Sequence, residues 1–333
     1  MNIKTLAVTA VTLCLLPSQA LAIHASHGEH GHCEGGVAQP LLTVADFDGN
    51  GIVDGSDIQL LTARVNSGEY TAIFDRNADG VLDEQDIVAA AQENESVSTA
   101  FDRELVAVFN ATERYRDLNN AIADGYRPFT PELAGHGFHY TRLPIAFTAT
   151  GIDWTWENWM DSTVEITKPE GLNYDENGQL VAVFYYHGIN VLDWILARTS
   201  GNMEWSMALA QESVARSTII PLPTVFSNED ELWHHHYGAC WAGLDYPRMQ
   251  VDPTWTPGFN QQMTYADCVA FNAAEGQTAT GWIPAMNMMH LWVHTLNECG
   301  VFSGTDPHVS HDAPEEPLFQ PLMDWFAAMG ISM

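Results

Sequence analysis

Two twelve-residue windows with the same pattern of oxygen-bearing side chains constrain this chain more than any other feature. They begin at Asp46 and Asp75, 29 positions apart (75 minus 46). Calcium takes six to eight oxygen ligands, and a loop of this length supplies them from positions 1, 3, 5, 7, 9 and 12. A glycine at position 6 makes the sharp turn, and Gly51 and Gly80 stand there. The tandem pair therefore predicts two calcium sites.

The predicted ligands follow from this spacing. In the first window they are Asp46, Asp48, Asn50, the Ile52 carbonyl, Asp54 and Asp57. In the second they are Asp75, Asn77, Asp79, the Val81 carbonyl, Asp83 and Asp86. Position 12 is aspartate in both windows, where most EF-hands have the longer glutamate, so this ligand must approach the ion more closely. The alternative is a pair of acidic turns without an ion, whose gathered carboxylates would repel one another.

The flanking sequence favours loop–helix units over complete helix–loop–helix hands. After the first window, Ile58, Leu61 and Val65 keep helical spacing. Before it, Pro40 leaves little room for an entering helix. At these residues the chain, over about 44–92, resembles the dockerin class of duplicated calcium module, in which aspartate at position 12 is usual. The resemblance implies calcium ligation and a role as a tag that docks a cohesin-like protein partner.

The first 22 residues have the pattern of a secretory signal peptide. Lys4 precedes an apolar run from Leu6 to Leu16, and a small-residue cleavage pattern ends at Ala22. The apolar run is too short to span a bilayer, and no later stretch is apolar for about 20 residues. We therefore expect a protein without a membrane span, cleaved after Ala22 and secreted or periplasmic.

The length of 333 residues leaves room for a small module and one larger domain. The expected parts are a signal peptide (1–22), a histidine-rich flexible segment (23–43), the paired calcium module (44–92) and a metal-binding domain (100–333). Short strand-like runs alternate with turns and helix-like segments in the large domain, which predicts an α+β fold class after an all-α calcium module. The polar stretch 93–99 suggests a hinge, and a single long helix is expected over 100–124.

The charge balance limits the partners. The chain has 43 acidic residues, only 12 lysines and arginines, and a formal net charge of −31. Such a surface argues against nucleic acid and anionic membranes as partners, and it favours metal ions. Adaptation to a saline habitat explains the same charge equally well.

Histidines give the large domain its candidate metal site. Three are consecutive, at 234–236, and a second motif reads His290-x-x-x-His294. On a strand, His234 and His236 share a face, and His290 would complete a three-histidine site for copper or zinc. If the second motif is helical instead, His290 and His294 share a face and both could bind. The alternative is a set of ordinary core and surface histidines.

A second group of candidates lies upstream. His139 is a candidate additional ligand, and Glu170 is a candidate ligand or general base beside a metal. Alternatively, His136 and His139 only cap a glycine turn. Methionines at 286, 288 and 289 would suit copper, although methionines before an aromatic stretch are also common in cores.

The chain has five cysteines, at positions 14, 33, 240, 268 and 299. Of the five, Cys14 leaves with the signal, and the remaining four allow three pairings. In an oxidising compartment we expect Cys240 to pair with Cys268, with Cys33 and Cys299 either paired or both free.

Directly after the expected cleavage site comes a tract with four histidines in nine residues (24 to 32), namely His24, His27, His30 and His32. Such a tract can capture transition metals without a preformed geometry, or it can be only a linker that is rich in histidine.

Several of these motifs also carry a looser resemblance over most of 105–310. They are Gly137-x-His139-Tyr140, Pro169-Glu170-x-Leu172, Trp233-His-x-His236, Cys240, Cys268 and His290-x-Trp292. In this pattern the chain resembles a set of exported, uncharacterised bacterial proteins with WHxH, cysteine and HxW motifs. The resemblance implies that these histidines and cysteines belong to one site region, and it supplies no reaction.

The preferred hypothesis is a secreted calcium-binding protein whose C-terminal domain binds copper or zinc through histidines, with metalloenzyme activity left open. One alternative is a calcium-dependent docking or adhesion scaffold of the dockerin–cohesin type. Another is a dockerin-bearing enzyme that degrades polysaccharides, which rests on analogy alone.

Overall fold

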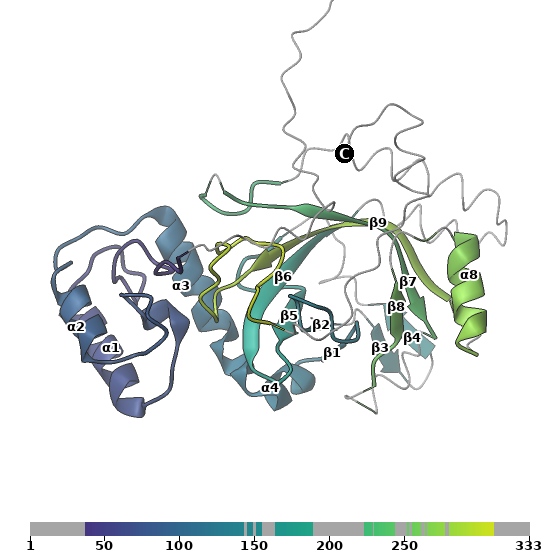
Figure 1. The fold of residues 1–333 in the computed structure, drawn as a ribbon, viewed down its shortest axis with the longest axis horizontal. Helices are drawn as coiled ribbons and strands as arrows, with labels where there is room; N and C mark the ends of the chain where they lie inside the picture. Colours follow the sequence, from purple (N-terminus) through teal and green to yellow (C-terminus); the bar gives the residue numbers. More distant parts are fainter. Residues whose placement is uncertain are drawn as a thin grey trace, which may run out of the picture.

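The computed structural model describes residues 37–142, 145–148, 151–154, 164–188, 223–228, 230–243, 252, 255–260, 263, 265–276 and 280–309. These residues combine helices with antiparallel sheets, which confirms the expected mixture of α and β structure. A helical part lies at one end and a curved sheet at the other (Figure 1). Within the described ranges, no helix is both long enough and apolar enough to cross a membrane.

The helical part contains two loop–helix repeats. Helices α1 (Gly55–Ser67) and α2 (Glu84–Ala91) follow the two predicted calcium loops, and a 3-10 turn, η1 (Ala72–Phe74), precedes the second loop. Each helix begins with a capping box, in which the N-cap aspartate accepts from backbone N–H groups of the first turn and a second aspartate accepts from the N–H of the N-cap residue. The pairs are Asp54 with Asp57 and Asp83 with Asp86. The last two ligand positions of each loop therefore also start its helix.

The single helix expected over 100–124 is wrong, because the chain bends within it. The segment forms α3 (Ala100–Thr112), a 3-10 turn η2 (Glu113–Arg116) and α4 (Leu118–Ala123). The break falls at Asp117, whose backbone is extended and whose carboxylate accepts a hydrogen bond from the backbone N–H of Asn119. Aspartate is a strong N-cap residue, so it starts a new helix here.

The expected hinge at 93–99 is also wrong, because this stretch pairs with the first of the two predicted calcium loops. The backbone N–H of Val53 donates to Ser96 at 2.9 Å, and that of Ser98 donates to Gly51 at 3.2 Å. Ile52 and Val97 form an antiparallel bridge. Backbone polar groups need partners, and here a polar segment supplies them to a loop that has no strand of its own.

One apolar core runs through both parts of the molecule. Leu61 of α1 and Ile73 of η1 belong to the same cluster of buried residues as Leu105 of α3 and Leu291 of the sheet. At its edge, the Asp102 carboxylate accepts hydrogen bonds from the backbone N–H and the hydroxyl of Thr43, both at 2.6 Å. The two loop–helix repeats therefore share one packed core with α3 and the sheet.

The main sheet has seven antiparallel strands in the order β1-β2-β5-β6-β9-β7-β8. The strands are β1 (Tyr126–Pro128), β2 (Phe138–Arg142), β5 (Gly171–Tyr174), β6 (Leu180–Gly188), β7 (His234–Ala242), β8 (Gly258–Asn260) and β9 (Thr280–Leu291). A separate hairpin pairs β3 (Ile145–Thr148) with β4 (Gly151–Trp154). Helix α8 (Tyr265–Ala274) packs beside β7 and β9 (Figure 1).

The two faces of the sheet have different contents. Leu172, Val183 and Leu291 form one cross-strand row over β5, β6 and β9, and all three belong to the core shared with α3. Neighbouring residues along a strand point to the opposite face. There, Phe184 of β6 pairs with His290 of β9, so the histidine motifs are placed on the face away from the shared core.

The predicted disulfide between Cys240 of β7 and Cys268 of α8 is confirmed, with the two Cα atoms 5.6 Å apart. It attaches α8 to the sheet. Cys299 is disulfide-bonded as well, so the alternative in which it is free is wrong. Its partner lies outside the described residues, as do the signal segment, the histidine tract and Cys33.

Candidate functional site

Five buried histidines gather on one side of the sheet, and we call them the histidine cluster. His136 precedes β2, His139 lies on β2, His234 and His236 lie on β7, and His290 lies on β9. The most exposed of them, His234, has only 7% of its surface accessible. Residues more than 150 positions apart in sequence, such as His139 and His290, are thus neighbours in space.

Strand pairing explains how three of these histidines meet. His234 pairs with Met288 across β7 and β9. Residues two apart on a strand share a face, and so do directly opposed residues of an antiparallel pair. His236 therefore shares a face with His234, and His290 shares it with Met288. Strand alternation thus accounts for the common face of His234 and His236, and the pairing of β7 with β9 adds His290 to that face.

The rings of the cluster are closely spaced. Ring centroids lie 4.9 Å apart for His234 and His236 and 5.1 Å apart for His234 and His290. They lie 5.2 Å apart for His136 and His290, 5.5 Å for His139 and His290, and 5.6 Å for His136 and His139. The Nε2 atoms of His139 and His290 are 3.3 Å apart.

The nitrogens of three rings do not yet converge on one point. Among the residues that the structure describes, the group whose candidate ligand atoms all lie within 4.8 Å of one another is Asp46, Asp48 and Asp57. No three of the described histidines bring ring nitrogens within that distance of one another, so an ion held by three of them would require one or more rings to turn about the side-chain torsions.

His136 is the member that sequence reasoning placed only as a turn cap. Its Nδ1 lies 2.9 Å from the Ala134 carbonyl oxygen, which can only accept, so this nitrogen carries the proton. The lone pair of the neutral ring is then on Nε2. A metal-binding histidine commonly donates its other ring N–H to a carbonyl in this way. The local signal was the Gly-His-Gly pattern, which forces a turn beside β2.

One ring of the cluster, that of His139, is held in its neutral form. Burial lowers the pKa of His139 well below its usual value, and neighbouring His136 and His236 lower it further. This histidine is therefore neutral at pH 7. The neutral imidazole is the form that binds metal ions.

An apolar wall closes one side of the cluster. The ring of Phe184 lies 5.2 Å from that of His139 and 6.0 Å from that of His290, measured between centroids. It fits because Gly171, its partner on β5, has no side chain, and a Cβ there would overlap the Phe184 ring. The wall limits access of water to the histidines from this direction.

Gly137 fixes the turn that presents His136 and His139. Its φ is +67°, and a Cβ would collide with the carbonyl oxygen of Tyr174 on β5. We expect Gly137→Ala to destabilise the protein by an overpacking term of about 1–3 kcal/mol, on top of the left-handed backbone term of about 1–2 kcal/mol. Urea unfolding measures the sum.

Gly178→Ala is the matched control for this prediction, because Gly178 also has a positive φ, +75°, but no atom lies within 4 Å of its added Cβ. It should lose only the backbone term. Equal losses in the two variants would show that the approach of Gly137 to Tyr174 is unimportant.

His294 is not part of the cluster. The helical alternative for its motif is wrong, since 280–291 is strand β9. The Nε2 of His294 lies 2.8 Å from the Thr112 hydroxyl, and its ring packs on Phe109 of α3. Burial, and then the charge of Arg116, lower its pKa to about 3. His294 therefore belongs to the contact between the sheet and α3.

Glu170 lies beside buried tyrosines. Its Oε2 accepts a hydrogen bond of 3.3 Å from the backbone N–H of Tyr186. Burial, and then the Glu170 charge, raise the pKa of Tyr185 well above its usual value. Tyr185 points away from Phe184 along β6, so Glu170 is associated with the opposite face from the histidine rings.

The methionines divide between the two faces. Met289 belongs to the core shared with α3, as the alternative interpretation proposed for this run. Met288 is also buried but pairs with His234 on the histidine face. One thioether thus stands next to the cluster.

The two predicted calcium loops repeat the same hydrogen bonds. At position 12, Asp57 accepts from the backbone N–H groups of Phe47 at 2.7 Å and Asp54 at 2.8 Å. The equivalent Asp86 accepts from those of Arg76 and Asp83, both at 2.8 Å. An aspartate at this position closes each loop by reaching its backbone.

The aspartate at position 1 of each loop has one carboxylate oxygen in a hydrogen bond to the loop and one without such a bond. One carboxylate oxygen, Oδ2, of Asp46 and of Asp75 accepts from the position 6 glycine, Gly51 or Gly80, at 2.9 Å. The other, Oδ1, is buried in both residues and accepts no hydrogen bond from the described part of the chain. A buried carboxylate oxygen without a partner costs about 1–3 kcal/mol or more, so both loops present an acceptor that a cation would satisfy.

The close packing of carboxylates in the loops also favours a bound cation. Burial raises the pKa of Asp57 and of Asp75. In the first loop, candidate ligand oxygens of Asp46, Asp48 and Asp57 all lie within 4.8 Å of one another. The second loop has the same number of carboxylates, but its neutral residue is Asn77 at position 3, whereas that of the first loop is Asn50 at position 5.

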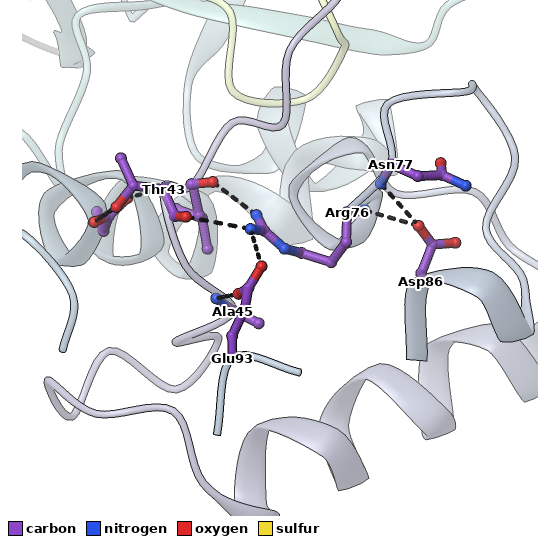
Figure 2. Close-up of polar contacts among 8 residues, drawn as sticks. Thr43, Ala45, Arg76, Asn77, Asp86 and Glu93 are labelled. Atoms are coloured by element: carbon purple, nitrogen blue, oxygen red, sulfur yellow. Dashed lines mark hydrogen bonds and ion pairs between the residues drawn. The ribbon is translucent and has the colours of Figure 1, made fainter. Parts of the chain in front are cut away.

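A buried arginine connects the two loops (Figure 2). Arg76, at position 2 of the second loop, donates to the Leu42 carbonyl and to Glu93, both at 2.7 Å. Glu93 in turn accepts a 2.6 Å hydrogen bond from the backbone N–H of Ala45, directly before the first loop. A chain of hydrogen bonds through Arg76 and Glu93 therefore connects the second loop to the residue that precedes the first.

Comparison of the chain with known protein families, with curated proteins and with solved structures found no match. The resemblances to dockerin modules and to exported bacterial proteins remain predictions.

Proposed function

We propose that this protein is a secreted calcium-binding protein whose sheet domain binds copper or zinc in the histidine cluster. The observation that carries the proposal is the meeting of five buried imidazoles, with the Nε2 atoms of His139 and His290 3.3 Å apart.

The Nε2 atoms of His139 and His290 stand at the spacing of two ligands of a tetrahedral ion. Zinc–nitrogen bonds of about 2.0–2.1 Å in a tetrahedron place neighbouring ligand nitrogens about 3.3–3.4 Å apart, and the ring centroids about 5.2 Å apart. The observed centroid separations run from 4.9 to 5.6 Å. Packed aromatic rings have similar centroid separations, so the short distance between the two Nε2 atoms supports the proposal more strongly than the ring spacing does.

The nature of the ligand atoms bears on whether copper or zinc would bind. Imidazole nitrogens suit both metals, and a soft thioether such as that of Met288 favours copper in its reduced state. A bound ion with an open position would activate water or bind a substrate directly. The chain contributes the neutral imidazole of His139 and the apolar wall of Phe184.

Metal analysis of the protein, purified without a polyhistidine tag, tests this proposal. The four histidines of the N-terminal tract are first replaced by glutamine, so that they bind none of the metal, and excess calcium occupies the aspartate loops. Copper or zinc should remain with the protein through dialysis. Failure of the metal-free protein to take up either ion on titration would overturn the proposal.

Each aspartate loop is proposed to bind one calcium ion. The buried Oδ1 atoms of Asp46 and Asp75 and the matching hydrogen bonds of the two loops support this. The net charge of −31 attracts cations to the whole surface.

A docking role is the second candidate function. Leu60 of α1 and Val88 of α2 are exposed apolar residues, at 41% and 58%, on helices that contact each other. Calcium-dependent binding to a purified cohesin domain tests it. The double change Leu60→Glu with Val88→Glu should abolish such binding, and binding that survives it would exclude these helices as the docking surface.

Secretion is part of the proposal, and it predicts a second disulfide bond. Cleavage after Ala22 would remove Cys14 and leave Cys33 as the cysteine that can pair with the disulfide-bonded Cys299. We expect non-reducing peptide mapping by mass spectrometry to find a peptide that joins Cys33 to Cys299. A free Cys33 thiol in the mature protein would contradict this.

A further inference from the structure

We infer that two hydroxyl groups outside the calcium loops, those of Ser98 and Tyr70, orient the first aspartate of each loop toward its ion. This inference rests on the proposed calcium binding, and it names two positioning residues that set the affinity of each site. It also extends the first site to Ser98, beyond the module expected over 44–92.

In the first loop, two donors hold one carboxylate oxygen of Asp46. The hydroxyl of Ser98 donates to Oδ2 at 2.5 Å, and the backbone N–H of Gly51 donates to the same atom at 2.9 Å. A carboxylate oxygen has about two lone-pair sites, so these two donors fill Oδ2. Oδ1 is buried and accepts no hydrogen bond from the described part of the chain. The carboxylate is thus held by one oxygen and offers the other to a cation.

The second loop has the same arrangement. The hydroxyl of Tyr70 donates to Oδ2 of Asp75 at 3.0 Å, and the backbone N–H of Gly80 donates to that atom at 2.9 Å. Oδ1 of Asp75 is also buried, and no described residue donates to it. In both loops a side-chain hydroxyl from outside the loop therefore completes the pair of donors on Oδ2.

The duplication of the loop sequence does not account for this match. Tyr70 stands five residues before Asp75. The equivalent position before Asp46 is Leu41, which has no hydroxyl. Ser98 supplies the donor instead, from 52 residues further along the chain. Two different segments place a hydroxyl on the equivalent oxygen, and this favours a common role in orienting the carboxylate.

An arginine holds each of the two donors in place. Arg103 of α3 donates through Nη1 to the carbonyl of Ser98 at 2.9 Å and to its hydroxyl oxygen at 3.2 Å. Because that oxygen accepts from Arg103, the hydroxyl hydrogen is left for Asp46. Arg116 of η2 donates through Nη2 to the carbonyl of Tyr70 at 2.9 Å. The segment that follows the expected module therefore fixes both hydroxyls.

Loss of either hydroxyl should weaken one calcium site. Without it, Oδ2 keeps only the glycine N–H, and the carboxylate turns more freely about its terminal torsion. Groups that orient a metal ligand contribute about 10–100-fold to metal affinity, so we expect a loss of about tenfold. Ser98→Ala should cause this loss in the first loop and Tyr70→Phe in the second.

Nuclear magnetic resonance of the isotopically labelled full chain measures the two loops separately. The backbone N–H groups of Gly51 and Gly80 bond to the two ligand aspartates, so their signals report the occupation of each loop. Calcium is titrated with a chelator that buffers its free concentration. Ser98→Ala should raise the half-saturation concentration at Gly51 about tenfold and change that at Gly80 far less. Tyr70→Phe should have the reverse effect.

Two matched variants test whether the loss of any nearby hydroxyl has this effect. Ser96→Ala removes a serine hydroxyl from the same segment, in a residue that pairs with Val53 through its backbone. Tyr115→Phe removes a tyrosine hydroxyl that donates at 2.9 Å to Asp124, a carboxylate outside the loops. Both variants should keep the natural calcium affinity at both loops.

The outcomes separate the two proposals. If neither glycine signal of the natural protein responds to calcium, the calcium-binding function itself is overturned. A response whose half-saturation is unchanged by Ser98→Ala and Tyr70→Phe overturns the positioning role and leaves calcium binding in place. Equal weakening of both loops, or the same weakening in a control variant, indicates general damage and also overturns it. The two loops are independent tests, so either variant alone decides.

Discussion

Replacing His290 by glutamine is expected to remove most of the transition metal from the sheet domain. His290 contacts His139 through Nε2 and has its ring within 5.2 Å of those of His136 and His234. Loss of a residue that only orients a ligand already weakens metal binding about 10–100-fold, so loss of the central ligand should weaken it by at least about 100-fold. Equilibrium dialysis against a competing chelator measures the affinity.

Two controls separate ligand loss from damage to the fold. His308→Gln changes an exposed histidine and should leave the metal affinity unchanged. His294→Gln changes the other histidine of the same sequence motif, which is partly buried against Thr112 and Phe109 of α3. It should lower stability without changing the metal affinity of the folded protein. A His290 variant that keeps its metal would contradict the site, and so would metal loss in the His308 variant.

The candidate site was predictable from sequence where strand alternation alone decides it. His234 and His236 are two apart on one strand, so their common face follows from the period of a strand. The position of His290 beside them depends on the pairing of β7 with β9, which no local pattern encodes. His136 joins through a turn whose direction is set by the approach of Gly137 to Tyr174, and this approach cannot be read from the Gly-His-Gly pattern.

In the helical part, too, features set by neighbouring residues could be predicted, whereas features set by distant contacts could not. Loop positions and capping residues are local, so both loop–helix repeats could be placed from the sequence. The stretch 93–99 suggests a hinge because it is polar, yet its backbone bonds to Gly51 and Val53 of the first loop. The helix expected over 100–124 ends early because Asp117 caps a new helix, and apolar periodicity does not detect such a break.

Calcium is expected to stabilise the whole described fold rather than the loops alone. An ion that binds only the folded state contributes about 2.7 kcal/mol per site when its free concentration is a hundredfold above Kd. The first loop bonds to Ser98, and the core that contains Leu61 continues through α3 to Leu291. We therefore expect one cooperative unfolding transition that shifts to higher temperature with calcium, followed by circular dichroism with calcium or with chelator.

The change Asp46→Asn should remove the first loop's share of this shift. The amide oxygen can still accept from the N–H of Gly51, whereas the amide NH₂ group cannot bind a cation. In chelator the variant should be at least as stable as the natural protein, because one of three clustered carboxylates, those of Asp46, Asp48 and Asp57, has lost its charge.

Such a crossing, with unchanged or higher stability in chelator and a smaller gain in calcium, distinguishes a lost calcium ligand from a damaged loop. Asp175→Asn is the charge-matched control, because Asp175 also accepts backbone hydrogen bonds in a tight turn but lies between β5 and β6. It should keep the full calcium response. If the natural protein melts at the same temperature in calcium and in chelator, the buried Oδ1 atoms of Asp46 and Asp75 are not calcium ligands, and the paired loops are only acidic turns.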